Sequence, residues 1–235
     1  MPPDFPNGVW RFFRLLATPI FLWYIRVRGT GTQHLPASGP ALLVSNHQSY
    51  LDPLAIAFPA SRPVSYVARS NLFSIPLLGW IFRRTYVIPI RRDGGAAGGI
   101  RAAAERLGEG FLVGVFPEGT RSPDGRLAPL KPGLLSILKR APVTVIPVGV
   151  AGTRHSLGRG DFLVKPAAVR VVFGSPISPA QVQQLLNTPC EESALLHKIA
   201  DDMANCLSLA ENWLAARTLE PPASEAPPAQ DSSTP

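Results

Sequence analysis

Short apolar runs alternate with helix-like segments along most of the chain. Six runs rich in Val, Ile and Leu have the length and composition of buried strands, and they are Ala41–Ser45, Val64–Ala68, Tyr86–Ile90, Leu112–Phe116, Val143–Val150 and Val169–Phe173. Between them lie helical segments, at Leu51–Phe58, Ile75–Arg83, Gly98–Leu107 and Gly133–Arg140. Strands that alternate with helices are typical of α/β proteins. We therefore expect one α/β domain with a mixed, mainly parallel sheet flanked by helices.

The C-terminal part of the chain predicts a long helix followed by a disordered tail. Residues 191–217 place apolar side chains at three- and four-residue steps, which is the pattern of a helix packed on one face. From Pro221 onward the chain is rich in Pro, Ser and Ala, and such segments bury too little apolar surface to fold. We divide the chain into an N-terminal membrane-associating segment (1–28), the α/β domain (29–217) and a disordered tail (218–235).

The N-terminal segment is apolar and aromatic but short. Its uncharged part, residues 15–25, falls below the about twenty residues that span a bilayer. No small-residue cleavage site follows, which argues against a cleaved signal. We expect an amphipathic helix that lies in the membrane interface, with its aromatic side chains inward and Arg11 and Arg14 at the headgroups. A buried core helix is the alternative, and the apolar segment 75–82 is either core or a second patch that dips into the membrane.

The charge of the chain is unevenly distributed. The net charge is +7, and residues 1–100 carry ten Lys or Arg against three Asp or Glu, whereas residues 166–235 carry three against eight. A basic front of this kind is expected to meet an anion: a phospholipid surface, a phosphorylated substrate or nucleic acid. Two cysteines, sixteen residues apart, form neither a disulfide framework nor a zinc knuckle.

A first candidate for chemistry is NHQSYLD at residues 46–52, directly after a predicted strand. His47 and Asp52 would lie about 140° apart on one continuous helix. If His47 instead lies in a turn and Asp52 in the first helical turn, the carboxylate can reach back to the imidazole. Such a contact would fix the tautomer and leave Nε2 free to accept a proton. A capped turn with a hydrogen-bonded histidine is the alternative.

A second candidate is FPEGTRS at residues 116–122, which also follows a predicted strand. Gly119 lets the backbone approach a ligand, and Arg121 can donate two hydrogen bonds to a phosphate. Thr120 adds a hydroxyl. Glu118 fits an anion site only if it accepts a hydrogen bond from a hydroxyl or holds Arg121. An ordinary turn with an ion pair is the alternative.

Other motifs point to no chemistry. The glycine-rich stretch 94–99 has neither the G-x-G-x-x-G spacing nor a following G-K-[ST], so we expect a flexible loop there. His34, His155 and His197 stand far apart with no metal-ligand spacing, and we expect no metal site.

Taken in order, the two motifs resemble those of the glycerolipid acyltransferase family, whose best-known members are the lysophosphatidic acid (1-acylglycerol-3-phosphate) acyltransferases. Three further blocks resemble the family's intermediate, lysine-glycine and proline-containing blocks, and they are YVIPIRR (86–92), LKPG (130–133) and VIPV (145–148). The resemblance covers roughly residues 30–175. The chain departs from the family where Arg91 stands in place of a common acidic residue, which adds positive charge near the acceptor site.

The resemblance implies a site and a reaction. His47 would be the general base and Asp52 would orient it, while the substrate contacts would come from Asn46, Arg92, Glu118, Gly119, Thr120, Arg121 and Lys131. An acyl group would move from acyl-CoA or acyl-carrier protein to the free hydroxyl of lysophosphatidic acid, giving phosphatidic acid for phospholipid biosynthesis, with no cofactor. The same chemistry on glycerol-3-phosphate, another lysophospholipid or a lyso-aminolipid is the alternative. A non-enzymatic basic membrane-binding module ranks below both.

The resemblance also implies binding partners and a cellular location. We expect a lipid substrate, a membrane surface and, for one of the two donors, acyl-carrier protein as partners, and no nucleic acid. We expect the protein on the cytoplasmic face of the cell inner membrane, as a peripheral or monotopic protein.

Overall fold

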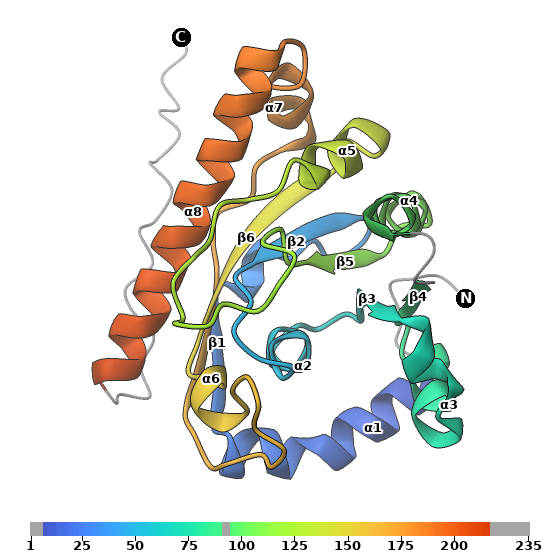
Figure 1. Cartoon of the computed structure of the whole chain (residues 1–235), viewed down its shortest axis with the longest axis vertical. Helices are drawn as coiled ribbons and strands as arrows, with labels where there is room; N and C mark the ends of the chain where they lie inside the picture. The colour runs from blue at the N-terminus through green and yellow to red at the C-terminus, as the bar shows by residue number, and fades with distance from the viewer. Residues whose placement is uncertain (1–6, 91–94, 217–235) are drawn as a thin grey trace, which may run out of the picture.

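A seven-stranded sheet with helices on both faces forms the core of the molecule (Figure 1). The computed structural model describes residues 7–90 and 95–216. The strands follow the order β1-β7-β6-β2-β5-β3-β4, and they are β1 (Val27–Thr30), β2 (Ala41–Ser45), β3 (Val64–Arg69), β4 (Ile88–Ile90), β5 (Leu112–Val115), β6 (Thr144–Ala151) and β7 (Val169–Phe173). Neighbouring strands are parallel except β6 and β7, which are antiparallel. The predicted mixed, mainly parallel sheet is confirmed.

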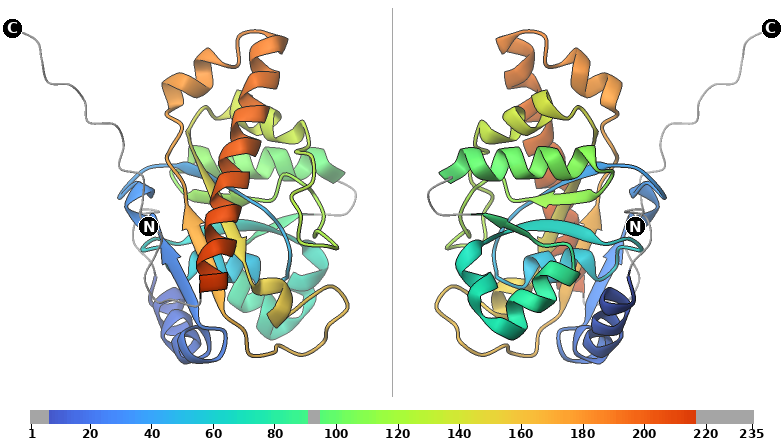
Figure 2. Two further views of the ribbon diagram at one scale, coloured as in Figure 1. Left: turned by 90° about the vertical axis from the view of Figure 1, so that its left-hand side faces the viewer. Right: turned by 90° about the vertical axis from the view of Figure 1, so that its right-hand side faces the viewer.

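The sheet buries apolar side chains on both faces because successive strand residues point in opposite directions. Leu42 and Val44 of β2 pack towards α4 (Gly95–Gly108), α5 (Gly133–Arg140) and α8 (Pro189–Ala216). Figure 2 shows α8 crossing one side of the sheet.

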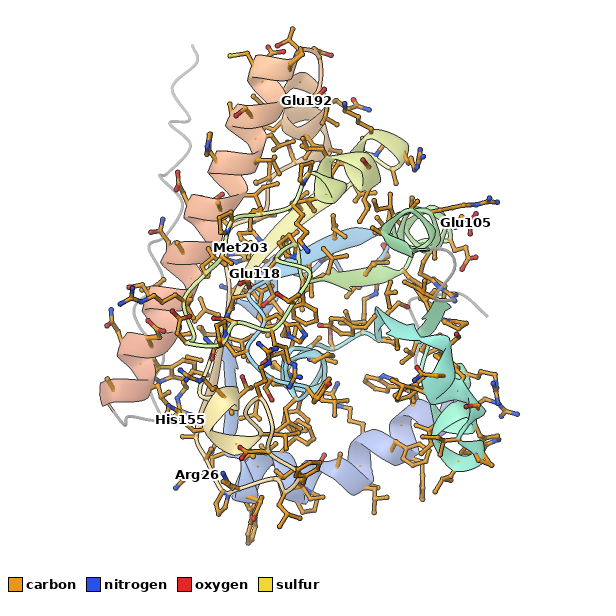
Figure 3. All side chains as sticks on the ribbon, viewed as in Figure 1. Arg26, Glu105, Glu118, His155, Glu192 and Met203 are labelled. Atoms are coloured by element: carbon orange, nitrogen blue, oxygen red, sulfur yellow. The ribbon has the colours of Figure 1, made fainter. Side chains whose placement is uncertain are left out.

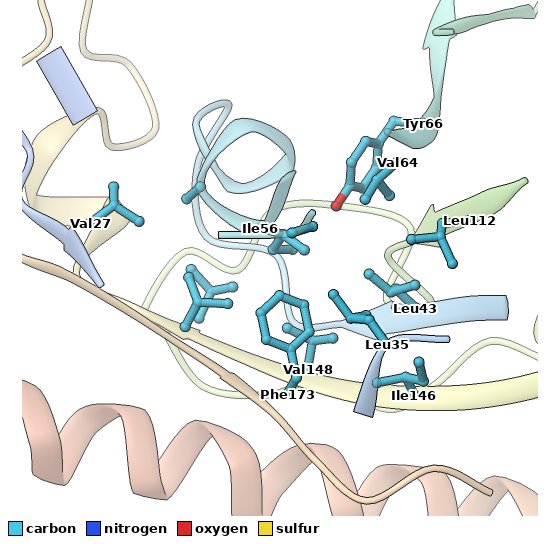
Figure 4. Close-up of a cluster of buried hydrophobic side chains, with 14 of the residues drawn as sticks. Val27, Leu35, Leu43, Ile56, Val64, Tyr66, Leu112, Ile146, Val148 and Phe173 are labelled. Carbon is cyan, nitrogen blue, oxygen red and sulfur yellow. The ribbon is translucent and has the colours of Figure 1, made fainter. Parts of the chain in front are cut away.

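The opposite face of the sheet is covered by α2 and the N-terminal segment. Leu43 packs there against Ile56 of α2 (Asp52–Ala57), and Phe21 of the N-terminal segment belongs to the same cluster. Figure 4 shows this cluster between α2 and the central strands. The helical layers therefore leave the ends of the strands as the place where polar loops can gather.

The N-terminal segment lies along one end of the molecule as α1 (Gly8–Pro19), which continues into a π-helical turn, η1 (Ile20–Tyr24) (Figure 1). No residue of α1 is buried, so the alternative of a buried core helix is wrong for this part. Phe12 and Leu15 are among its exposed apolar side chains. Within residues 7–90 and 95–216, no helix combines the length and apolar character that crossing a membrane requires.

One N-terminal arginine does not take the orientation that we expected. Arg14 Nη1 donates a 2.5 Å hydrogen bond to the Ala60 carbonyl, and its guanidinium carbon lies 5.8 Å from the centroid of the Phe58 ring. The side chain therefore holds α1 against the domain rather than facing headgroups. The cause is that Phe58 and Ala60, which follow α2, offer an aromatic face and a free carbonyl within reach.

The apolar segment 75–82 forms most of α3 (Pro76–Arg84), which packs beside α1. Phe13 of α1 meets Trp80 of α3 in an edge-on contact with ring centroids 6.2 Å apart. Leu77 of α3 is exposed. This segment is therefore a surface helix, whose exposed apolar side chains continue the outer face of α1.

Five elements of the described residues escaped the sequence analysis, and they are β1, α6 (Thr153–Ser156), α7 (Pro179–Gln184) and the 3₁₀ turns η2 (Thr32–His34) and η3 (Ser70–Ser74). Each is short, and β1 has no apolar alternation because it pairs only at the edge of the sheet, with β7. The flexible loop predicted over 94–99 is wrong for residues 95–99, where α4 begins. A methyl group on Gly99 would come within 2.9 Å of Ile90 Cδ1, so glycine allows α4 to approach β4 closely. The predicted disordered tail, 218–235, lies outside the described residues.

Gly149 of β6 tests how tightly α8 packs on the sheet. A Cβ atom at this position would lie 2.2 Å from the carbonyl carbon of Cys206, and a helix backbone cannot turn aside as a side chain can. We expect Gly149→Ala to lower the free energy of unfolding by roughly 1–3 kcal/mol, the usual cost of overpacking, in urea denaturation. Gly108→Ala is the matched control, because nothing lies within 4 Å of a Cβ there. Equal stability of the two variants would contradict this packing.

Candidate active site

Three loops that are far apart in sequence meet at one edge of the sheet. Strands β2, β5 and β6 are mutually parallel, so their carboxyl ends lie at the same edge, which is where α/β proteins place their sites. The loops that follow them carry NHQSYLD (46–52), FPEGTRS (116–122) and Gly152-Thr153. The first two are tied together by the Ser122 amide, which donates to the His47 carbonyl at 2.7 Å.

His47 and Asp52 form a hydrogen-bonded pair. The His47 Nδ1 atom lies 2.8 Å from Asp52 Oδ2, so the predicted contact is confirmed. Because a carboxylate accepts this bond, the proton belongs on Nδ1, and Nε2 carries the free lone pair. The His47 side chain is 18% exposed and that of Asp52 is fully buried. The pair therefore presents one basic nitrogen to the solvent side of the loops.

Asp52 is held by four donors. Its Oδ2 also accepts the backbone amides of Gln48 at 2.6 Å and Ser49 at 2.7 Å, while Oδ1 accepts the Thr153 hydroxyl at 2.5 Å. These donors satisfy both oxygens of the carboxylate, which offsets part of the cost of burying it. Asp52 can therefore stay an acceptor that fixes the imidazole. Thr153 was not foreseen, because a single threonine after a glycine carries no signal in the sequence.

Aromatic stacking fixes the plane of the imidazole. The His47 ring lies on Phe116 with centroids 4.0 Å apart and an interplanar angle of 16°, and Tyr66 lies on the same phenyl ring at 5.7 Å. The Tyr66 hydroxyl is buried and has no hydrogen-bond partner in the described part of the chain. Burial, with a smaller contribution from the charge of Asp52, raises the pKa of Tyr66 well above its ordinary value. Tyr66 is thus a neutral donor inside the site.

Glu118 holds the two loops together. Its Oε1 accepts the His47 amide at 2.8 Å and its Oε2 accepts the Ala128 amide at 3.0 Å, and the residue is buried. Burial raises the pKa of Glu118 above its ordinary value, although these two backbone hydrogen bonds oppose the shift. Among the described residues, neither a hydroxyl nor Arg121 donates to it, and its contact with a substrate hydroxyl stays a prediction. Both oxygens therefore position the backbone on either side of the site.

The other residues of FPEGTRS form a cationic side of the site. Arg121 stacks on Tyr50, with its guanidinium carbon 3.6 Å from the ring centroid. Its Nη1 is buried without a partner in the described part of the chain, so a donor is available for an anion. Lys131 Nζ lies 2.5 Å from the position of a Cβ on Gly119, so glycine makes room for the lysine there. The structure thus brings Arg121, Gly119 and Lys131 into one loop region, with Thr120 exposed beside them.

Two polar residues of NHQSYLD serve the scaffold. The Asn46 amide exchanges two hydrogen bonds with the Val150 backbone, at 2.9 and 2.8 Å, and pins the end of β2 to β6. Asn46 is buried and bonded to β6, and its role as a substrate contact stays a prediction. Ser49 is buried and donates to the Leu157 carbonyl at 2.6 Å, so it is not an exposed nucleophile. Arg92, the remaining predicted contact, lies outside the described residues.

No group of three His, Cys, Asp or Glu side chains within the described ranges could hold a metal ion. What the arrangement offers is an oriented imidazole, a buried carboxylate behind it and a cationic loop beside it. Figure 3 labels Glu118 in the midst of these loops. Such a set can accept a proton from a hydroxyl and hold an anionic group.

Glu118 provides a test of the way in which the loops are joined. In Glu118→Gln the amide group can accept one of the two backbone N–H groups, but its NH₂ must face the other donor. We expect the free energy of unfolding to fall by roughly 1–3 kcal/mol, the cost of a buried unpaired donor. Thermal unfolding measures this change, with Glu211→Gln on the surface of α8 as a control. A Glu118→Gln variant as stable as this control would contradict the role of Glu118.

Comparison with known proteins agrees with the geometry. A sequence model of the family described as Acyltransferase matches residues 26–151, which is more than half of the chain. The 1-acyl-sn-glycerol-3-phosphate acyltransferase BAT2 of Brassica napus is 32% identical over 177 residues, covering 74% of this chain and 49% of that protein. The 1-acyl-sn-glycerol-3-phosphate acyltransferase of Bacillus subtilis is 24% identical, covering 65% of this chain and 74% of that protein.

The fold also has a solved counterpart. The crystal structure of the 1-acyl-sn-glycerophosphate acyltransferase PlsC from Thermotoga maritima superposes with a TM-score of 0.70 at 24% identity, over 89% of this chain and 81% of that one. The chain spans about half the length of the plant relatives that it matches. The family match, with the His47–Asp52 pair inside the matched residues, shows that this chain belongs to the Acyltransferase family.

Proposed function

We propose that this protein transfers a fatty acyl group from an acyl thioester to the free hydroxyl of lysophosphatidic acid, giving phosphatidic acid. The observation that carries the proposal is the His47 imidazole, braced by Asp52 through Nδ1 and unbonded at Nε2 within the described residues. The proposal is supported by relatives named 1-acyl-sn-glycerol-3-phosphate acyltransferase. In the cell, the product would enter phospholipid biosynthesis.

The reaction needs one base and no covalent intermediate. His47 Nε2 takes the proton of the acceptor hydroxyl as its oxygen attacks the thioester carbonyl carbon. The carbonyl re-forms, the C–S bond breaks, and the departing sulfur takes the proton from the imidazolium. Asp52 stabilises the imidazolium while the proton is on it, and the stack on Phe116 keeps Nε2 aimed at the acceptor. The Tyr66 hydroxyl, buried and without a partner among the described residues, is available as a donor within the same ring stack.

The acceptor phosphate would bind to the cationic loop. Arg121 has a buried donor without a partner in the described part of the chain, and its guanidinium is held flat against Tyr50. A guanidinium whose plane is fixed loses less entropy when it binds a phosphate, and it can donate two parallel bonds. Lys131 would add a second charge beside Gly119, and Thr120 a hydroxyl. The site therefore suits an acceptor that carries both a hydroxyl and a phosphate.

The acceptor also carries an acyl chain, which need not leave the lipid phase. The outer face of α1 exposes Phe12, Leu15 and Leu16, and an apolar surface of this kind suits the membrane interface. We propose a peripheral or monotopic protein on the cytoplasmic face of the inner membrane, the side on which acyl thioesters occur. The donor would be acyl-CoA or acyl-carrier protein, as a co-substrate rather than a resident cofactor.

His47→Ala tests the proposed base. We expect turnover with lysophosphatidic acid and acyl-CoA to fall by about 10²- to 10⁴-fold, the usual contribution of a positioned base. Product is measured by mass spectrometry, with glycerol-3-phosphate, another lysophospholipid and a lyso-aminolipid as competing acceptors. His197→Ala, on the exposed face of α8, is the matched control and should keep the wild-type rate. Near-normal turnover of a folded His47→Ala protein would rule out the base, and a preference for a competing acceptor would replace lysophosphatidic acid.

Arg121→Gln tests where the phosphate binds. Losing charge-assisted hydrogen bonds should raise the KM for lysophosphatidic acid roughly 10- to 100-fold while kcat changes little. The KM for monoacylglycerol, an acceptor that lacks the phosphate, should be the same in Arg121→Gln as in the wild-type protein. Arg126→Gln, an exposed cation of the same loop, serves as the control. Equal effects of both substitutions on KM would mean that general charge, and not Arg121, attracts the acceptor.

A further inference from the structure

A second basic site lies at the same edge of the sheet as the His47–Asp52 pair. A cavity of about 700 Å³ opens between the starts of β1 and β7, α6 and the end of α8. Figure 3 labels two of its lining residues, Arg26 and His155, at the end of the molecule where α1 and α6 lie. The mechanism proposed above uses none of the residues that line it.

Three arginines of the cavity stand close together. The buried Arg170 donates a 3.1 Å hydrogen bond to the Arg26 carbonyl, and its guanidinium lies 4.9 Å from the centroid of the Trp213 ring. Burial, and to a smaller extent the charges of Arg28 and Arg26, lowers the pKa of Arg170. No carboxylate forms an ion pair with Arg26 or Arg28 in the part of the chain that the structure describes. Like charges held this close favour a bound anion, which would relieve their repulsion.

Exposed apolar side chains lie in η1 and in the loop after α6, two segments that also contribute residues to the cavity lining. Trp23 of η1 is 83% exposed, and Phe162 and Leu163, in the loop that follows α6, are 98% and 77% exposed. The loop and η1 are joined by the Tyr24 hydroxyl, which donates to the Val164 carbonyl at 3.1 Å. In Figure 1 this loop runs along the same end of the molecule as α1 and η1. Large apolar side chains so exposed next to a basic site are typical of a membrane contact.

We propose that the cavity binds the phosphate headgroup of an anionic bilayer lipid, while Phe162, Leu163 and Trp23 enter the apolar layer beside it. Charge complementarity carries the choice of occupant, since the arginines match a phosphate and the apolar rim matches acyl chains. Helix α6 connects the cavity with the candidate active site. Its Thr153 donates to Asp52, and its His155 lines the cavity. A headgroup bound here would turn the catalytic edge of the sheet towards the bilayer. This inference deepens the proposed function and rests on it.

Vesicle co-sedimentation tests the headgroup site. Removing two cations near an anionic surface should weaken binding roughly 10- to 30-fold. We expect this loss of affinity when Arg26→Gln/Arg28→Gln is compared with the wild-type protein. The vesicles are phosphatidylcholine that contains phosphatidylglycerol. On pure phosphatidylcholine the double variant should bind as wild type does. Arg101→Gln/Arg140→Gln removes the same charge from the exposed surfaces of α4 and α5 and should retain binding to within about twofold. Arg26→Gln alone, at an exposed position, provides the test if the double variant folds poorly, with a loss of about fivefold.

Two further measurements separate this proposal from its rivals. Phe162→Ser/Leu163→Ser should weaken binding to both kinds of vesicle, because it removes apolar contact rather than charge. In neutral detergent micelles, Arg26→Gln/Arg28→Gln should keep the wild-type KM for lysophosphatidic acid and for acyl-CoA. A raised KM for either substrate there would make the cavity a substrate site and overturn the proposal.

The remaining outcomes are also decisive. Equal losses for the Arg26/Arg28 and Arg101/Arg140 double variants on anionic vesicles would reduce the effect to net charge and overturn the headgroup site. If the wild-type protein transferred no acyl group to any acceptor, the proposed function would fail, whereas the headgroup site itself fails only if Arg26→Gln/Arg28→Gln binds anionic vesicles no more weakly than Arg101→Gln/Arg140→Gln does.

Discussion

The buried carboxylate of Asp52 is the group on which the site depends. Its four hydrogen bonds join the turn that carries His47, the amides of Gln48 and Ser49, and Thr153 at the end of β6. A carboxylate without these donors would be costly to bury, and an imidazole without the carboxylate would have no fixed tautomer. One interaction therefore sets both the local fold of the loop and the nitrogen that is presented for chemistry. The parallel order of β2 and β6 is what brings its partners together.

A second buried carboxylate, Glu118, plays the corresponding part for the backbone. It receives the amides of His47 and Ala128 and so spans the loop that carries the cationic side chains. The different positions of the carboxylates and the cationic side chains follow from their solvation. Carboxylates that need protein donors lie inside, where they fix the position of the loops. The cationic side chains of the loop are less buried, since Arg121 is partly exposed and Lys131 is exposed.

The edge of the sheet that carries the site also faces the apolar parts of the surface. Strand β7 pairs antiparallel with β6 and parallel with β1. The starts of β1 and β7 therefore lie beside the end of β6. Basic residues at these starts therefore lie near the loops that carry His47 and Thr153. Exposed aromatic side chains lie in α1, η1 and the loop after α6, which run along one end of the molecule (Figure 1). A protein that draws a lipid acceptor from a bilayer needs this combination on a single side.

Much of this arrangement could be predicted from the sequence, because it depends on local patterns. The apolar runs predicted six of the seven strands, and the pairing of His47 with Asp52 followed from five residues and the geometry of one turn. The polar residues of FPEGTRS were recognised as a group, although the backbone amides that Glu118 accepts were not predicted. The sequence by itself thus determined the fold class and the contact between His47 and Asp52.

The tertiary structure alone decided the contacts between distant segments. Thr153 lies 101 residues from Asp52, Val150 lies 104 from Asn46, and Arg170 is 144 from Arg26. Each contact depends on which strands are neighbours and on the register between them. The residues that form the contact determine neither the strand order nor the register. The stack of Tyr66 on Phe116 and the arginine cavity have the same origin. Local spacing can orient one side chain towards another, but only strand order can bring a third residue to complete the site.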